Sequence, residues 1–257
     1  MFPASMLLYD EVIWLCNNKN SMSGRGLIFR VAASSLWAST SLMEQSRMSY
    51  ELYTLAGSCS MAIHAVMNEL GLAPNVHIMD KTEGENGLKS TTFKKMNPRA
   101  NAPFITEDGK GVGEGAAIVA YLCDKEGKLL PKTGHERAKA LQWLMFANST
   151  LHPAYGRTFW LNTYLPEAVR DEALKTARSQ IQDLWNYVEA ELEKSGGTYL
   201  CGSEITCGDF LIATIANWNP VAYKFGPKTK ALLASVSARP SYQKALSAES
   251  IEYKAAA

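Results

Sequence analysis

The chain of 257 residues lacks the features that mark several common classes of protein. Its formal net charge is only +1, and it has no sustained stripe of lysine and arginine, so we expect no nucleic-acid partner. No apolar run is long enough to cross a bilayer, so we expect no membrane partner. A hydrophobic content of 47% with 20% charged residues is that of a globular protein with an ample core.

The cysteines are few and irregularly spaced, and none forms a C-x-x-C pair, which argues against a disulfide framework. The histidines are scattered and none makes a zinc-like pair with a nearby cysteine, so we expect no metal. Free thiols of this kind are typical of a reducing compartment, and we expect a cytoplasmic protein. The cysteines are Cys16, Cys59, Cys123, Cys201 and Cys207.

Residues 1–48 differ in composition from the rest of the chain. No acidic residue occurs from Val12 to Met43, while arginines and serines do, which weakly resembles a transit peptide. Asp10 and Glu11 interrupt the first apolar run, so a secretory signal is a poor match. We interpret residues 1–48 as an N-terminal extension that is disordered or non-native, with Met48 beginning the folded part.

The stretch from Tyr50 to Gly71 has the clearest local pattern. Six β-forming residues precede a Gly-Ser break, and apolar residues then recur at helical spacing until a glycine cap signal at Gly71. Cys59 therefore stands where a strand turns into a helix. Because a helix start offers unpaired N–H groups and a favourable dipole, we expect the Cys59 thiol to lean toward thiolate.

The next segments complete a small α/β domain over residues 49–127. Val76–Met79 predicts a second, parallel strand, and the polar stretch 80–90 predicts a loop. An Asp-Gly pair at 108–109 predicts a hairpin turn, and residues 114–122 then follow helical spacing. This order of strands and helices is typical of a thioredoxin-like domain.

Residues 128–134 predict a linker, and the pattern beyond it, over 135–257, is helical almost throughout. One long helix is expected to stop at the glycine pair 196–197. The pattern Thr206-x-x-Asp209 predicts a capping box that opens a helix apolar nearly all round. We expect that helix to be the buried centre of an all-α domain.

Several short motifs occur one after another along these two domains. They are Tyr53-Thr-Leu-Ala-Gly-Ser-Cys59-Ser60, Asn97-Pro98 with Ala102-Pro103, Glu114-Gly115-Ala-Ala-Ile118, Trp143-Leu-Met-Phe146 through His152, Thr206-x-x-Asp209, Asn217-Trp218, and Arg239-Pro240 with Ala245-Leu-Ser-Ala-Glu249. Together they resemble the bacterial beta class of the glutathione transferases, from about Tyr50 to Glu249. The resemblance implies a thioredoxin-like N-terminal α/β domain, an all-α C-terminal domain and a homodimer.

The resemblance also implies roles for residues of the first domain. Cys59 would face the glutathione sulfur and could form a mixed disulfide with it. Ala102, which precedes the proline Pro103 that is cis in the family, would pair its backbone with the cysteinyl part of glutathione. Glu114 and Gly115 would hold the γ-glutamyl end, because a carboxylate pairs with an ammonium and helix-start N–H groups accept a carboxylate.

From the helical domain, Ser149 and His152 would reach over to glutathione, and Cys59 with His152 would be the catalytic pair. The sequence also departs from the family pattern. Met145 stands where the family has an asparagine, which removes one polar contact. A loop lysine has no aligned partner; Gly84 lies nearest, and Lys81 or Lys89 could substitute.

Three functions fit this resemblance. The first is a glutathione transferase that joins the glutathione thiolate to small electrophilic substrates, with glutathione as co-substrate. The second is a glutathione-dependent monothiol disulfide reductase or peroxidase in which Cys59 is the nucleophile. The third is a non-catalytic transferase-fold binding protein, which the departures favour. We expect His64 to be structural and Trp218 to be core or site wall.

Overall fold

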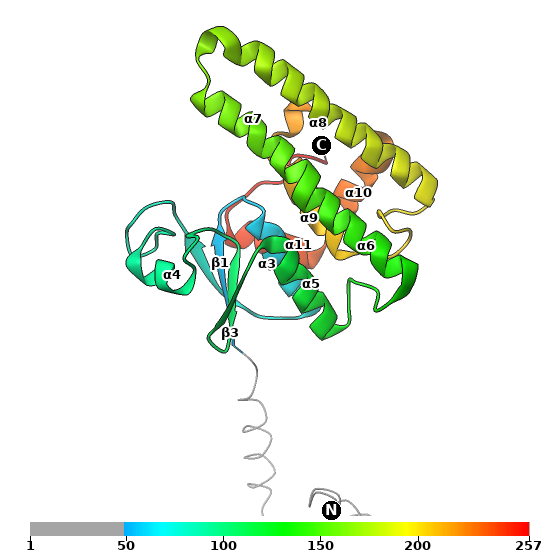
Figure 1. Cartoon of the computed structure of the whole chain (residues 1–257). Coiled ribbons are helices and arrows are strands. Elements are labelled where there is room, and N and C mark those ends of the chain that lie inside the picture. The colour runs from blue at the N-terminus through cyan, green and yellow to red at the C-terminus, as the bar shows by residue number, and fades with distance from the viewer. Residues whose placement is uncertain (1–48, 257) are drawn as a thin grey trace, which may run out of the picture. The chain divides into compact units, whose positions relative to one another are not determined.

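The structure, a computed structural model, describes residues 49–256. The predicted N-terminal extension over 1–48, and the alternatives of a targeting segment or an overlong start, lie outside the described residues. In the described part, a small sheet flanked by helices is followed by a larger group of helices (Figure 1). The expected thioredoxin-like half and all-helical half are therefore confirmed.

The first half is built on a four-stranded sheet with the order β2-β1-β3-β4. The central strand β1 pairs in parallel with β2 and antiparallel with β3, and β3 pairs antiparallel with β4. Asp108 and Gly109 form the β3–β4 turn with φ angles of 47° and 80°, as the Asp-Gly signal predicts. The strands are β1 (Tyr50–Leu55), β2 (Asn75–Met79), β3 (Phe104–Glu107) and β4 (Lys110–Gly113).

Side-chain alternation along β1 assigns one helix layer to each face of the sheet. Leu52 packs in the main core with α3 (Ser60–Leu70) and α5 (Gly115–Glu126). Tyr53, on the opposite face, packs with Phe93 of α4 (Thr91–Met96). We did not predict α4, a short helix whose start is capped by the Ser90 hydroxyl, which accepts the Phe93 N–H at 3.2 Å.

The second half consists of helices packed around a common core. α6 and α7 form one continuous rod through a π-helical turn, and α8 returns beside α7 (Figure 1). The long α8 ends as predicted, with Gly196 in the left-handed conformation. The elements are α6 (Gly134–Phe146), η1 (Ala147–Leu151), α7 (His152–Tyr164), α8 (Glu167–Ser195), α9 (Cys207–Ala216), η2 (Pro220–Ala222), α10 (Pro227–Ser237) and α11 (Pro240–Ala248).

The helix α9 is the centre of this core, as its composition predicts. All of its residues are buried, and its capping box is formed. The Asp209 carboxylate accepts the Thr206 N–H at 2.7 Å and the Leu200 N–H at 3.0 Å. The bond to Thr206 belongs to the capping box, and the bond to Leu200 satisfies a buried N–H of the segment before the helix.

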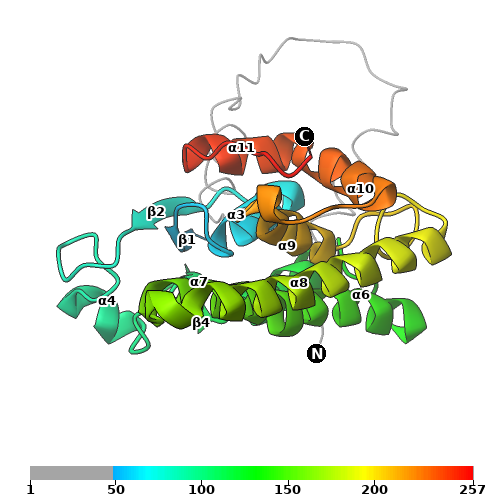
Figure 2. The same cartoon turned by 90° about the horizontal axis from the view of Figure 1, so that it is seen from above.

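The last helix, α11, packs against α3 and so connects the end of the chain to the first half of the molecule (Figure 2). On the outer side of this contact, Arg239 and Ser241 bind the Glu69 carboxylate. Within residues 49–256, no helix combines the length and the apolar character needed to cross a bilayer. In the same part of the chain, no cluster of His, Cys, Asp and Glu side chains could hold a metal ion.

Candidate functional site

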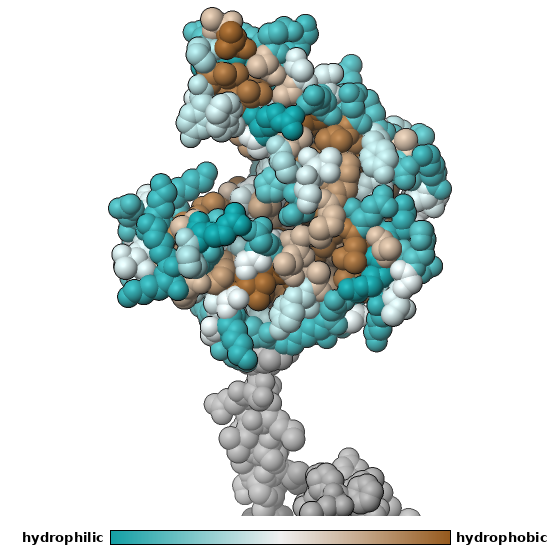
Figure 3. Space-filling view, in the orientation of Figure 1, coloured by the Kyte–Doolittle hydropathy of each residue, from teal (hydrophilic) through white to brown (hydrophobic). Residues whose placement is uncertain are grey.

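Two cavities meet at Cys59, and Figure 3 shows the surface hollowed between the sheet half and the arm of α7 and α8. We call the larger one, of about 670 Å³, the aromatic cavity. The smaller, of about 310 Å³, is the polar cavity. Both are lined by Cys59, Ala102 and His152, so the Cys59 sulfur and the His152 ring stand between two separate binding spaces.

The aromatic cavity has a wall of rings from the helical half. Trp218 donates its indole N–H to the Gly57 carbonyl at 2.9 Å, which fixes the ring beside the turn that carries Cys59. The His152 ring meets Trp218 edge to face at 4.8 Å, and the Phe159 ring lies 6.0 Å from Trp218. The remaining lining residues are Leu55, Ala56, Ser58, Met79, Asp80 and Lys81.

The polar cavity opens onto the first turn of α5. Glu114 precedes that helix with a φ of 64°, and its side chain does not cap the helix, so the first N–H groups are not satisfied by their own cap residue. The Glu114 carboxylate pairs with the Arg99 guanidinium at 2.6 Å on the surface. The remaining lining residues are Asn101, Pro103, Gly115, Asn148, Pro153 and Gly156.

The ionisation of Cys59 differs from our expectation. Burial raises the pKa of the Cys59 thiol to about 11, since removing the sulfur from water penalises its charged form. The N–H groups of Cys59 and Ser60 oppose this shift, whereas Glu114 and Glu249 add to it. The predicted lean toward thiolate is therefore wrong, because the desolvation of the sulfur outweighs the helix start. Near neutral pH, Cys59 is a thiol that can donate a hydrogen bond.

The turn that carries Cys59 is fixed from the far end of the chain. Glu249, which is 4% exposed, accepts the Gly57 N–H and the Thr54 hydroxyl, each at 2.8 Å. Thr54 also bonds the Ser60 hydroxyl at 2.6 Å, at the first residue of α3. This buried network holds both sides of the Cys59 turn, and burial raises the pKa of the Glu249 carboxyl.

His152 begins α7 and is half-buried at the junction of the two cavities. Burial lowers the pKa of its imidazole, so the ring is neutral near neutral pH. The structure brings this residue together with Cys59, Ala102 and the start of α5 at Gly115. The cis peptide bond between Ala102 and Pro103, which the family resemblance implies, is present.

Ser149 is the predicted site residue that the structure does not bring to the cleft. It lies in η1, is exposed, and lines neither cavity. Sequence reasoning missed Asn148, which lines the polar cavity instead, and Phe159. Phe159 follows His152 by seven residues on α7, so helical spacing could have identified it. Asn148 precedes His152 by four residues, so the same spacing places it on the face of His152. The π-helical turn, which the sequence pattern did not predict, instead rotates Ser149 away from that face.

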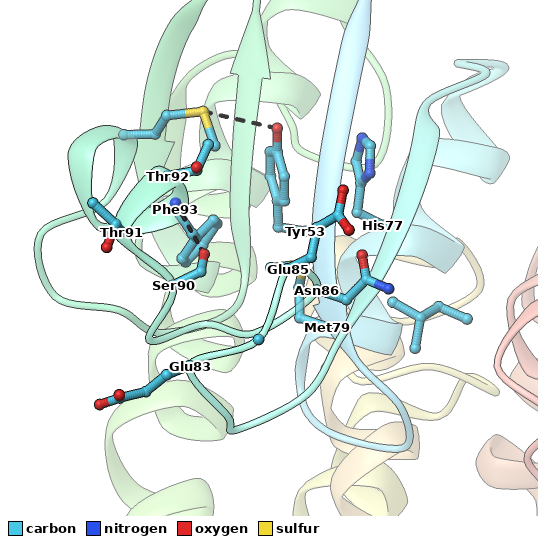
Figure 4. Close-up of a pocket in the computed structure, with 13 residues that line it drawn as sticks. Tyr53, His77, Met79, Glu83, Glu85, Asn86, Ser90, Thr91, Thr92 and Phe93 are labelled. Atoms are coloured by element: carbon cyan, nitrogen blue, oxygen red, sulfur yellow. Dashed lines mark hydrogen bonds between the residues drawn. The ribbon is translucent and has the colours of Figure 1, made fainter.

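The loop after β2 offers one of the two lysines that we considered as substitutes. Lys81 lines the aromatic cavity, whereas Lys89 lines neither of the two cavities at Cys59. Gly84 lines a third cavity of about 730 Å³, on the other side of the loop. Tyr53 and His77 stack at 4.7 Å inside that cavity (Figure 4). It contains none of the predicted site residues and meets the aromatic cavity only at Met79.

Comparisons with known proteins agree on one family. Residues 52–131 match the model of the glutathione S-transferase N-terminal domain, and residues 151–240 match that of the C-terminal domain. A glutathione S-transferase of Xanthomonas campestris is 29% identical over 188 residues, which are 72% of this chain and 88% of that protein. A glutathione S-transferase of Drosophila melanogaster is 32% identical over 162 residues, which are 61% of this chain and 69% of that protein.

A solved structure gives the same likeness in three dimensions. It is a glutathione transferase from Phanerochaete chrysosporium in complex with oxidised glutathione. It is 27% identical to this chain with a TM-score of 0.68, over 80% of this chain and 98% of that one.

Proposed function

The chain belongs to the glutathione S-transferase family, and from that premise we propose that it joins the glutathione thiolate to small electrophilic substrates in the cleft at Cys59. The supporting observation is the meeting of two unlike cavities at one sulfur. Glutathione occupies the polar cavity and the electrophile occupies the aromatic cavity. The Phanerochaete chrysosporium relative is in complex with oxidised glutathione, and we extend glutathione binding to this chain.

The polar cavity suits the γ-glutamyl end of glutathione. Its ammonium pairs with Glu114, in place of the Arg99 guanidinium that Glu114 now contacts. Its α-carboxylate accepts N–H groups at the uncapped start of α5, beginning with Gly115. The cysteinyl part runs past the Ala102 backbone toward Cys59. This orientation directs the glutathione sulfur to the border of the aromatic cavity.

At that border the neutral groups of the site stabilise charge on the glutathione sulfur. Because Cys59 is a thiol near neutral pH, it donates its S–H to the glutathione thiolate. His152, kept neutral by burial, donates a ring N–H to the same sulfur. These donors lower the pKa of bound glutathione. The thiolate then attacks the electrophilic carbon, forms the carbon–sulfur bond and displaces a leaving group such as chloride.

The raised pKa of Cys59 bears on the alternative in which this residue attacks a disulfide. That reaction requires the Cys59 thiolate, and burial disfavours the charged form. A non-catalytic binding role is the third candidate. Each of the three makes a different prediction for the same variants of Cys59.

The test compares wild type with Cys59→Ala and Cys59→Ser. We expect kcat/KM for conjugation of a chlorodinitroarene to fall about tenfold in Cys59→Ala. A factor of this size corresponds to the free energy of one hydrogen bond to a charged group. The pKa of bound glutathione, read from thiolate absorbance against pH, should rise by about one unit, because one unit corresponds to about 1.4 kcal/mol. Cys59→Ser keeps a donor and should lose less.

Other outcomes separate the alternatives. Conjugation unchanged in Cys59→Ala, with reduction of a mixed glutathione disulfide lost, would support the disulfide reductase. Loss of both reactions would make Cys59 indispensable to both. Absence of turnover in wild type, together with no retention on glutathione-agarose, would support a binding protein. Intact mass after incubation with oxidised glutathione reveals whether one glutathione adds at Cys59.

We also propose a class, an oligomeric state and a compartment for this protein. The bacterial relative supports a place near the beta class, and the class resemblance supports a homodimer. Irregular free cysteines support a reducing, cytoplasmic compartment. We retain domain limits at 49–127 and 135–257, joined by the linker 128–134.

A further inference from the structure

The wall of the polar cavity opposite Cys59 contains a π-helical turn over Ala147–Leu151. There the His152 N–H bonds the Ala147 carbonyl, five residues earlier, instead of the carbonyl four residues earlier. Pro153 follows directly, inside the continuous rod of α6, η1 and α7. Because proline has no N–H and its ring crowds the carbonyl four residues before it, Pro153 accounts for the widened turn.

This turn changes which side chains face the cavity. In an uninterrupted α-helix, Asn148 and Ser149 would both lie on the face of His152, four and three residues before it. A π turn takes more residues to complete a circle, so the residues before His152 are rotated about the helix axis. Met145 is 40% exposed and Ser149 is exposed, and neither lines the cavity. Asn148 keeps its position beside His152, and both line the cavity.

The Asn148 amide lies next to the start of α5. Its Oδ1 is 4.0 Å from the point where a Cβ on Gly115 would stand. Among the described residues, the Asn148 amide has no hydrogen-bond partner. The first N–H groups of α5 have no side-chain cap either. An unpaired amide and unpaired backbone donors therefore converge on one small polar space.

We propose that Asn148 binds glutathione by donating its amide N–H to the α-carboxylate of the γ-glutamyl group, against the first turn of α5. This inference rests on the proposed function and names a residue of its glutathione site. An asparagine amide can turn to present its NH₂ group without moving its Cβ. Asn148 thus supplies the polar contact that Met145 lacks, and the π turn leaves it, rather than Ser149, beside His152.

The test uses glutathione and γ-aminobutyryl-Cys-Gly, the analogue that lacks only the α-carboxylate. Isothermal titration measures both ligands with wild type, Asn148→Ala and Thr150→Ala. Thr150 is exposed in the same turn, lines neither cavity, and serves as the matched control. We expect Asn148→Ala to bind glutathione about tenfold more weakly than wild type and to bind the analogue equally well. Thr150→Ala should match wild type with both ligands.

Asn148→Asp gives a second variant of almost unchanged shape. Its carboxylate repels the glutathione carboxylate, so it should lose more affinity for glutathione than Asn148→Ala and far less for the analogue. Thermal melting verifies that each variant is folded. A loss of equal size for both ligands, or no loss in either Asn148 variant, overturns the proposal. So does a carboxylate-selective loss in Ser149→Ala with none in the Asn148 variants.

The proposed function and the role of Asn148 can be overturned separately. If wild type does not bind glutathione at all, the proposed function and this inference are both overturned. If wild type binds glutathione and the Asn148 variants bind it as tightly, only the inference is overturned.

Discussion

The two walls of the cleft are held by different kinds of interaction. The wall that carries Cys59 is fixed by directional hydrogen bonds, including one from Gly57 to Glu249, 192 residues away along the chain. The opposite wall is made of rings in contact, with Trp218 at its centre. Hydrogen bonds fix the angles as well as the distances between groups, whereas contacts between rings tolerate ligands of different shape. The first wall therefore suits positioning of a sulfur, and the second suits variation in the electrophile.

Glu249→Ala is expected to have the largest effect, on the first wall. It leaves the buried Thr54 hydroxyl and the partly buried Gly57 N–H without their carboxylate acceptor. We expect the free energy of unfolding to fall by about 3 kcal/mol, since an unsatisfied buried donor costs about 1–3 kcal/mol. Urea unfolding measures this change. Glu252→Ala, at an exposed position nearby, is the control and should stay within about 0.5 kcal/mol of wild type.

A stability loss in Glu249→Ala no larger than that in Glu252→Ala would contradict a structural role for the buried network. In that case the Cys59 turn would be held by its local hydroxyl groups alone.

The second expected effect concerns pH and the same wall. His64 lies in α3, is 3% exposed, and its Nδ1 has no hydrogen-bond partner. Burial lowers its pKa from 6.5 to about 4, and the nearby Lys244 charge adds to the shift. Between these two pH values the unfolded chain binds the proton more tightly than the folded protein. The free energy of unfolding is therefore fully retained above about pH 6.5 and falls as the pH decreases toward 4.

We expect His64 to account for about 2 kcal/mol of the stability lost between pH 7 and pH 4. The measurement is urea unfolding at several pH values for wild type, His64→Gln and His135→Gln. The neutral amide of His64→Gln should flatten the pH dependence, whereas the exposed His135 should leave it unchanged. Identical slopes in wild type and His64→Gln would show that His64 does not titrate as burial requires.

The sequence predicted those parts of the molecule that short-range hydrogen bonds determine. The Asp108–Gly109 hairpin turn and the Thr206 capping box each depend on residues a few positions apart. Interactions across long separations were not readable, and the bond from Gly57 to Glu249 is an example. The short helix α4 was missed because it spans too few residues for a periodic pattern.

The candidate site divides in the same way. Cys59 follows from a local strand-to-helix turn and Ala102 from the family resemblance, and the structure places both in the cleft. Ser149 was expected from the family resemblance, and the π turn before Pro153 rotates it away from the cavity. The prediction that the Cys59 thiol leans toward thiolate was wrong because the helix start is a local feature, whereas the burial of the sulfur is set by the whole fold.

Phe159→Ala is expected to have the smallest effect, and it acts on the ring wall alone. The side chain lines the aromatic cavity and is absent from the polar one, so only the electrophile should lose a contact. Losing one ring contact of about 1 kcal/mol should raise the KM for a chlorodinitroarene about fivefold, with the KM for glutathione unchanged. Trp160→Ala is the matched control, because that neighbouring ring is 55% exposed and lines neither cavity. Equal effects on the KM values of both substrates would mean that the two walls act as one unit and do not have separate roles.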